Sequence, residues 1–278
     1  MITLEGVLWP TAVMGALGLA FGALLAFASI KFFARTDERV SLIRGILPGA
    51  NCGGCGRPGC DGYADGVVNG GVAMNLCAAG GPATARKIAE IMGATDELEA
   101  AAPLRAVLRC AGSPRSSVRN AIYDGVQDCR SAAVLPGFSP NACPFGCMGL
   151  GTCVEVCLFG ALSIADGLAV VDLEKCVGCG ACVSVCPKSV LNLTPMPAGL
   201  TAAARVACNS RWKGPDVKKV CSVGCVGCSI CVRLCPEKAI AVEDNLAEVD
   251  AAKCTGCGTC AAKCPVGAII CVGAFSQA

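Results

Sequence analysis

The chain begins with a long apolar stretch that predicts a membrane-spanning helix. No charged residue occurs from Val7 to Ile30, and an uncharged stretch of about 24 residues is long enough to cross a bilayer. The segment before it carries Glu5 and no lysine or arginine, whereas a signal peptide has a basic start and a shorter apolar core. The pattern therefore favours a retained anchor over residues 1–33 rather than a cleaved signal peptide.

Basic residues follow the apolar stretch directly. They are Lys31, Arg35, Arg39 and Arg44, and an excess of positive charge marks the cytoplasmic side of a membrane helix. A reducing compartment also suits a chain whose 25 cysteines serve metal rather than disulfides. The sequence therefore predicts a single-pass protein of the cell inner or cytoplasmic membrane, with the bulk of the chain on the cytoplasmic side.

Two later segments alternate apolar and polar residues in the way that β-strands do. They read "ALSIADGLAVVDLEKC" (161–176) and "AIAVEDNLAEVDAAKC" (239–254). Each alternates about a central pair, Asp166-Gly167 or Asp244-Asn245, and such pairs favour a two-residue hairpin turn. The two segments also resemble each other in sequence, so they predict two copies of one β-hairpin unit.

Composition limits the kind of core that the chain can build. It has 35 glycines, 8 phenylalanines, 2 tryptophans, 2 tyrosines and no histidine. So few aromatic residues leave little bulk for a large core, and small domains of this kind need another source of stability. The lack of histidine excludes Cys/His zinc sites and nearly all haem and catalytic-base arrangements.

The formal charge of +2 changes its meaning if the cysteines bind iron. A [4Fe–4S] cluster held by four thiolates carries a charge of about −2, so several clusters would make the folded protein acidic. The chain also has no run rich in lysine or arginine. No nucleic-acid partner is therefore expected.

One cysteine pattern occurs three times. The pattern C-x2-C-x2-C-x3-C-P is that of bacterial ferredoxins, in which three close cysteines bind one [4Fe–4S] cluster and the fourth binds the neighbouring cluster. The three copies are Cys176, Cys179, Cys182 and Cys186; Cys225, Cys228, Cys231 and Cys235; and Cys254, Cys257, Cys260 and Cys264.

A fourth, irregular copy precedes these three. It has the spacing Cys143-x3-Cys147-x5-Cys153-x3-Cys157, and Leu158 stands where proline is expected. With this copy the chain has two ferredoxin modules of two clusters each. The predicted ligand sets are Cys143, Cys147, Cys153 and Cys186; Cys157, Cys176, Cys179 and Cys182; Cys225, Cys228, Cys231 and Cys264; and Cys235, Cys254, Cys257 and Cys260.

A different cysteine pattern lies between the anchor and the ferredoxin modules. In "NCGGCGRPGCDGYADG" (51–66) the spacing is Cys52-x2-Cys55-x4-Cys60, and Cys77 follows. Glycines here permit left-handed turns around a bulky centre, so these four cysteines are the predicted ligands of a further [4Fe–4S] cluster. The segment resembles the N-terminal iron–sulfur domain of RnfB, a component of the Rnf complexes. That family also places a membrane anchor before this domain and ferredoxin modules after it.

The resemblance implies a function in electron transfer. An RnfB protein is part of an ion-translocating membrane oxidoreductase and accepts electrons from reduced ferredoxin. It passes them to multi-span membrane subunits and flavoprotein subunits. By this resemblance the chain is part of a ferredoxin-dependent oxidoreductase, of the ferredoxin:NAD type, with no catalytic residue that breaks a substrate bond. The resemblance leaves NAD, a quinone-like carrier or a cytochrome open as the final acceptor.

Two other functions fit the cysteine patterns alone. One is a membrane-tethered polyferredoxin subunit of another redox complex, and the other is a redox sensor or a protein that reduces a regulator. The domain with Cys52 and Cys77 favours the Rnf function, because generic polyferredoxins lack it.

Five cysteines fall outside these motifs. Cys110 and Cys129 precede the first ferredoxin module, while Cys208 and Cys221 follow it. Because the chain can enter and leave a compact domain at nearby points, these four are the predicted ligands of a sixth cluster that bridges the modules. Isolated buried thiols and a four-cysteine zinc site are the alternatives. Cys271, in an apolar terminal segment, is expected to be a buried free thiol.

Together these patterns predict an α+β protein of small cluster-stabilised domains behind one transmembrane helix. Within residues 84–106, apolar residues at helical spacing (Ala85, Ile88, Ala89 and Met92) predict a helical linker. The expected domains are an anchor (1–33), an N-terminal [4Fe–4S] domain (34–83), the linker (84–106), a first ferredoxin-like module with its flanking cysteines (107–215) and a second module (216–278).

Overall fold

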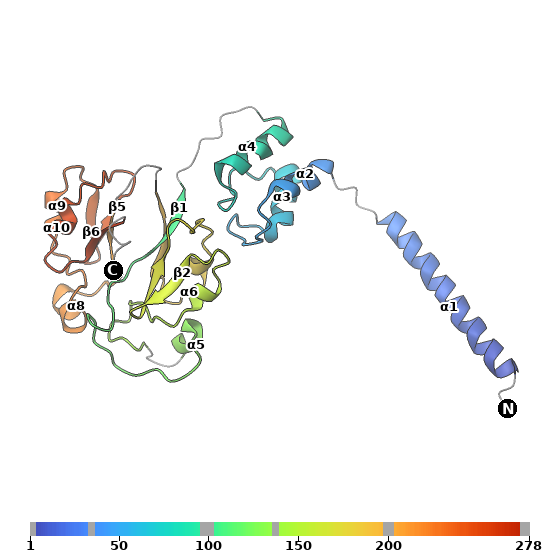
Figure 1. The fold of residues 1–278 in the computed structure, drawn as a ribbon, viewed down its shortest axis with the longest axis horizontal. Helices are drawn as coiled ribbons and strands as arrows, with labels where there is room; N and C mark the ends of the chain where they lie inside the picture. Colours follow the sequence, from blue (N-terminus) through green and yellow to red (C-terminus); the bar gives the residue numbers. More distant parts are fainter. Residues whose placement is uncertain (1–3, 33–36, 95–102, 135–138, 197–202, 273–278) are drawn as a thin grey trace.

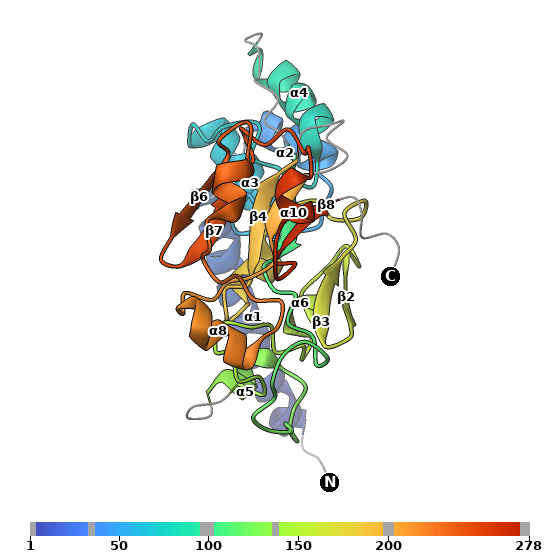
Figure 2. The same ribbon diagram turned by 90° about the vertical axis from the view of Figure 1, so that its left-hand side faces the viewer.

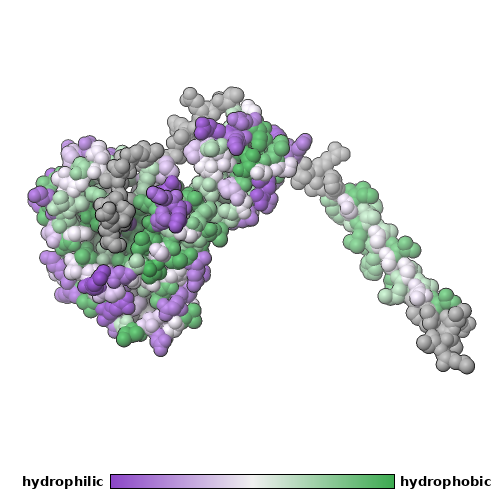
Figure 3. Space-filling view, viewed as in Figure 1, coloured by the Kyte–Doolittle hydropathy of each residue, from purple (hydrophilic) through white to green (hydrophobic). Residues whose placement is uncertain are grey.

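An apolar helix stands apart from the rest of the protein (Figure 1). The computed structural model describes residues 4–32, 37–94, 103–134, 139–196 and 203–272, and its first element is helix α1 (Leu4–Lys31). Its segment Thr11–Lys31 is long and apolar enough to cross a membrane, and its most apolar window is not buried against any other part of the structure. Figure 3 shows mostly apolar residues along the coloured part of α1. The helix is therefore suited to anchor the chain in a membrane, as predicted.

Three helices form the N-terminal domain. They are α2 (Glu38–Ile46), α3 (Gly59–Asn69) and α4 (Gly81–Met92). Ile43, Tyr63 and Ile88 meet at its centre, each at most 1% exposed. Because the apolar face of α4 is buried here, α4 belongs to this domain. The single helical linker predicted over 84–106 is therefore not formed: residues 95–102 lie outside the described part, and residues 104–108 form a strand.

The first ferredoxin-like module contains two antiparallel strand pairs. Strand β1 (Leu104–Leu108) pairs with β4 (Leu191–Pro195), and β2 (Leu162–Ala165) pairs with β3 (Leu168–Val171). Its helices are short: α5 (Cys129–Ala133), α6 (Thr152–Glu155) and α7 (Ala181–Ser184). Small mixed elements of this kind agree with the predicted fold class.

The second module repeats this plan. Strand β5 (Ala203–Val206) pairs with β8 (Ile269–Val272), and β6 (Ile240–Glu243) pairs with β7 (Leu246–Val249). Its helices are α8 (Gly214–Val220), α9 (Ile230–Leu234) and α10 (Thr259–Ala262). Because β5 pairs with the last strand, this module already includes residue 203 and does not begin at 216.

The two predicted hairpins are confirmed. In the β2–β3 turn, Asp166 and Gly167 have φ values of 47° and 69°, and in the β6–β7 turn Asp244 and Asn245 have φ values of 47° and 64°. Positive φ at both central residues is the conformation that suits the twist of a tight hairpin. Short side chains and glycine tolerate it best, which explains the residues found there.

The two modules lie side by side (Figures 1 and 2). Arg109, just after β1, forms an ion pair of 3.1 Å with Glu248 of β7. Arg205 of β5 donates a 2.6 Å hydrogen bond to the carbonyl oxygen of Leu108. The core of each module is small and includes several cysteines among its buried residues. Groups bound by those cysteines would therefore complete the cores.

Candidate iron–sulfur sites

Within the described residues, cysteines line five cavities of similar size, and each of these cavities has four of them. We number the sites along the order in which they neighbour one another. Site I has Cys52, Cys55, Cys60 and Cys77; site II has Cys157, Cys176, Cys179 and Cys182; site III has Cys129, Cys147, Cys153 and Cys186; site IV has Cys110, Cys143, Cys208 and Cys221; and site V has Cys225, Cys228, Cys231 and Cys264.

Site I is shaped by its glycines and by one buried tyrosine. The side-chain oxygen of Asn51 accepts a 2.8 Å hydrogen bond from the N–H of Cys60, and Gly59, with φ of 77°, leaves room for that side chain. Tyr63 donates to the carbonyl of Ala73 (2.9 Å) and accepts from the N–H of Leu76 (3.2 Å). These bonds fix the loop that carries Cys77. Burial raises the pKa of Tyr63 to about 12, so its hydroxyl keeps its proton.

Site II follows the regular ferredoxin pattern. Strand β1 covers it, and the N–H of Ala106 points at the sulfur of Cys176 (3.4 Å). The N–H of Ala161 points at the sulfur of Cys157 (3.3 Å). Such N–H groups favour the thiolate over the thiol and help to set the potential of an iron–sulfur cluster. Gly178 has φ of 72° and lies so close to the Leu104 carbonyl that no side chain fits between them.

Site III differs from the set that the sequence predicts, because it contains Cys129 in place of Cys143. Burial raises the pKa of Cys153 to about 12, and the neighbouring thiols of Cys147 and Cys129 raise it further. The cavity around Cys153 is lined by Cys129 as well. Cys129 thus lies with the first ferredoxin run and not with the cysteines between the modules.

A hydrogen-bond network holds Cys129 in this place. Asp128 caps helix α5 by accepting from the N–H of Ser131 (2.7 Å). The hydroxyl of Thr152 donates to the Asp128 carboxylate (2.6 Å) and accepts from the N–H of Cys129 (2.6 Å). Thr152 is 1% exposed and directly precedes Cys153. These bonds hold the pKa of Asp128 well below its usual range.

The sequence does contain a signal for this arrangement. Cys147, Leu150, Cys153 and Cys157 have the regular spacing x2, x2, x3, with Leu150 at the position of the second cysteine. Gly149 and Gly151 flank Leu150 as Gly178 and Gly180 flank Cys179, and all four have positive φ. The first run is therefore a regular run that lacks its second thiol, and Cys129 stands at its site instead.

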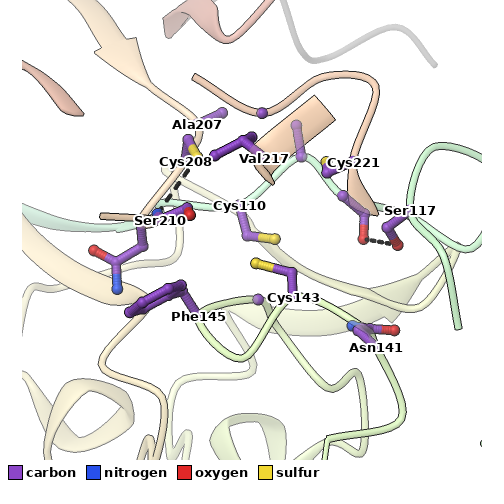
Figure 4. A pocket seen from close by; sticks show the side chains of 15 residues that line it. Cys110, Ser117, Asn141, Cys143, Phe145, Ala207, Cys208, Ser210, Val217 and Cys221 are labelled. Carbon is purple, nitrogen blue, oxygen red and sulfur yellow. Dashed lines mark hydrogen bonds between the residues drawn. The ribbon is translucent and has the colours of Figure 1, made fainter. Parts of the chain in front are cut away.

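Cys143 is found in site IV, where four cysteines meet from both modules. Figure 4 shows the sulfur atoms of Cys110 and Cys143 facing each other, with Cys208 and Cys221 nearby. Burial raises the pKa of Cys143, and the nearby thiols of Cys208 and Cys221 raise it further. Cys208 follows β5 and Cys221 ends α8. Three of the four cysteines predicted for a sixth cluster, Cys110, Cys208 and Cys221, thus meet at one point, but Cys143 stands there in place of the predicted Cys129.

Two thiols of site IV, Cys110 and Cys208, are well shielded from solvent. Burial raises the pKa of Cys110 to about 12, and Cys208 is 7% exposed. The N–H groups of Cys147 and Ser210 point at the sulfurs of Cys110 (3.4 Å) and Cys208 (3.5 Å). Four thiols around one cavity, with N–H groups directed at sulfur, are a donor set that fits a [4Fe–4S] cluster.

Sites V and VI share the second module. Site VI is the set that the sequence predicts, Cys235, Cys254, Cys257 and Cys260. The N–H of Ala268 points at the sulfur of Cys264 in site V, and that of Ala239 at the sulfur of Cys235 in site VI, both at 3.3 Å. These contacts repeat the Ala161–Cys157 contact of the first module.

The thiols of sites V and VI differ in exposure. Burial raises the pKa of Cys260 to about 11, and the thiols of Cys271 and Cys254 raise it further. Cys228 and Cys257 are exposed.

Neighbouring sites lie close to one another, so the six sites form one row. Gly54, between two cysteines of site I, packs on the backbone of Cys179 in site II. The thiol of Cys182 in site II is close enough to Cys153 in site III to raise the pKa of Cys153, after the larger effect of burial. Sites III and IV meet at the contact between Cys147 and Cys110. Sites IV and V meet where the N–H of Cys225 approaches the sulfur of Cys208. Burial, the largest effect, raises the pKa of Cys208, and this N–H lowers it. Sites V and VI meet where α9 packs on α10.

Three family models match these segments. An Fe-S cluster family matches residues 47–79, a 4Fe-4S binding domain matches 169–192, and a 4Fe-4S dicluster domain matches 224–268. Fold and sites thus define a membrane-anchored iron–sulfur protein of the electron-transfer class.

Whole-chain relatives identify the family. The chain is 42% identical to the B component of the Na(+)-translocating ferredoxin:NAD(+) oxidoreductase complex of Acetobacterium woodii, over 90% of this chain and 73% of the relative. It is 46% identical to the B component of the proton-translocating complex of Clostridium ljungdahlii, over 86% of this chain and 82% of the relative. The B component of the ion-translocating oxidoreductase complex of Methanosarcina acetivorans is 42% identical, over 87% and 89%. The chain belongs to the RnfB family of Rnf complex components, as its resemblance indicated.

Proposed function

We propose that this chain takes electrons from reduced ferredoxin and relays them along six [4Fe–4S] sites to the other subunits of an Rnf complex. Membership of the RnfB family and the three iron–sulfur domains support an electron-relay function. The two relatives named as components of ferredoxin:NAD(+) oxidoreductase complexes favour NAD as the final acceptor. Multi-span membrane subunits and flavoprotein subunits are the proposed partners.

The cysteines of sites I–VI are the proposed ligands. A [4Fe–4S] cluster supplies one-electron chemistry, with a potential set by charge, exposure and N–H···S hydrogen bonds. The chain's own contribution is to hold four thiolates around each cavity and to direct N–H groups at sulfur, as Ala106 does at Cys176. No general base or nucleophile is needed for this function.

Site IV is the observation on which the proposal depends most. Without a redox centre there, sites I–III and sites V–VI would form two separate groups. Cys110 and Cys143 come from the first module, and Cys208 and Cys221 come from the segment that leads into site V. A cluster at site IV therefore makes one continuous row from the N-terminal domain to the C-terminal module.

The anchor gives the row a direction. Helix α2 of the N-terminal domain begins a few residues after α1, whereas the second module lies on the far side of the first (Figure 1). Site I is therefore the end nearest the membrane. Sites V and VI, with exposed Cys228 and Cys257, are the end that a soluble ferredoxin can approach. We place this end on the cytoplasmic side, because basic residues follow α1.

Native membranes that carry the complex provide the test. In a Cys208→Ser/Cys221→Ser variant, iron analysis should show the loss of site IV alone, and EPR should still show the clusters of the other sites. Ferredoxin-dependent NAD reduction should then fall by about tenfold or more, since a broken relay blocks every turnover. Normal NAD reduction by a variant that lacks the iron of site IV would overturn the proposal.

A further inference from the structure

In each ferredoxin-type run, one strand residue lies seven positions after the last cysteine. Ile164 follows Cys157 in this way, and Leu193 follows Cys186. Val242 follows Cys235, and Cys271 follows Cys264. The first three are aliphatic, so at the last site a thiol stands where the other sites have a hydrocarbon side chain.

Equivalent contacts confirm that these positions correspond. A Cβ atom placed on Gly180 would lie 3.4 Å from Cδ1 of Leu193, and one placed on Gly258 would lie 3.7 Å from the sulfur of Cys271. Gly180 and Gly258 each directly follow the second cysteine of their run. Val242 lines the cavity of site V. The side chain of Cys271 therefore lies against the loop that carries Cys257 and Cys260.

Site VI thus has five thiols where a [4Fe–4S] cluster uses four. Cys271 lies close enough to Cys254, Cys257 and Cys260 to interact electrostatically with all three. Cys271 lies on strand β8 and is partly exposed, so the expectation of a buried thiol is wrong.

We propose that Cys271 is a reserve ligand of site VI, which takes the place of Cys257 when that thiolate is lost from the cluster. The inference rests on the proposed assignment of a cluster to site VI. Cys257 is exposed, so it is the ligand that oxidants and solvent reach first. In the exchange one iron–sulfur bond to Cys257 breaks and one to Cys271 forms. The Cys271 thiol gives up its proton and the released Cys257 can accept one, so the exchange requires no oxidant or reductant.

Site V supplies a matched control, because Cys228 is exposed like Cys257 but its cavity is lined by Val242, at the position where site VI has Cys271. The experiment uses anaerobically reconstituted full-length protein and measures iron per chain together with EPR of the reduced clusters. Cys257→Ala should keep the wild-type iron content, of roughly 24 atoms per chain. Cys228→Ala and the double variant Cys257→Ala/Cys271→Ala should each lose about one to four iron atoms.

A gain of function completes the test. Adding Val242→Cys to Cys228→Ala should restore iron to site V, since it gives that site the fifth thiol of site VI. If Cys257→Ala loses as much iron as Cys228→Ala while wild-type site VI is loaded, the reserve role of Cys271 is overturned. If wild-type protein itself lacks a cluster at Cys254 and Cys260, the assignment of site VI fails instead, so the two failures are distinguishable.

Discussion

Gly54 of the N-terminal domain packs directly against the backbone of Cys179 in the first ferredoxin module. A Cβ atom on Gly54 would lie 2.6 Å from the Cys179 carbonyl oxygen and 2.9 Å from its Cα atom. A contact this close excludes any side chain larger than hydrogen at position 54. It brings site I against site II at the point where the membrane-anchored domain meets the rest of the chain.

Replacement of Gly54 should separate these two domains without removing a cluster. In Gly54→Ala the new methyl group must push the Cys179 loop away, so ferredoxin-dependent electron delivery should slow by about tenfold while iron per chain stays unchanged. Gly45→Ala is the matched control, since a Cβ there meets nothing within 4 Å. Equal rates in the two variants would show that the Gly54 contact does not matter for transfer.

Loss of the Thr152 hydroxyl should weaken site III selectively. Thr152→Val removes the acceptor for the Cys129 N–H and the donor to Asp128. The two hydrogen bonds together contribute about 2 kcal/mol, so iron should leave site III about thirtyfold faster in a chelator assay followed by EPR. The other sites serve as the internal control. Uniform loss from all sites would point to general unfolding rather than to a role in placing Cys129.

Deletion of residues 1–33 should release the protein from the membrane. Leu24, Phe27 and other large apolar residues of α1 are exposed in the structure, and only a lipid or partner surface would cover them. The truncated chain should be soluble, brown and loaded with iron. A truncated chain that remains in the membrane fraction would contradict the assignment of α1 as the anchor.

Removal of the clusters should unfold the second module. Buried Cys225, Cys231 and Cys260 form part of its core, and few large apolar residues surround them, so metal binding and folding are coupled. Treatment with a chelator under oxidising conditions should abolish protection of the β6–β7 amides in hydrogen exchange. The N-terminal helices have Ile43, Tyr63 and Ile88 at their centre and should retain more protection. Unchanged β6–β7 protection would disprove the coupling.

The sequence predicted local features better than the assembly of distant ones. The anchor, the two hairpins and the regular ferredoxin runs each depend on nearby residues, and the structure contains all of them. Cys129 belongs to site III and Cys143 to site IV. This division depends on a contact between Asp128 and Thr152, which are 24 residues apart, and local cysteine spacing does not predict it. The replacement of a regular cysteine by Leu150 was visible in the sequence, but only as a gap in a repeat.

The boundaries of the helical linker and of the second module were not predicted correctly, for a similar reason. Strand β5 pairs with β8, more than 60 residues away along the chain, and β1 pairs with β4 across the whole first module. Strand pairing at such separation is fixed by the tertiary fold and not by the propensity of either strand. The spacing of apolar residues predicted helix α4, but it did not predict which part of the protein would cover the apolar face of the helix.

Site IV joins the two modules and contains Cys143 rather than Cys129. Iron analysis of two double variants distinguishes these two groupings. Cys110→Ala/Cys143→Ala alters one site and should lose up to about four iron atoms per chain, whereas Cys110→Ala/Cys129→Ala alters two sites and should lose up to about eight. The opposite order of losses would show that Cys129, and not Cys143, belongs to site IV, and would restore the grouping of Cys110, Cys129, Cys208 and Cys221.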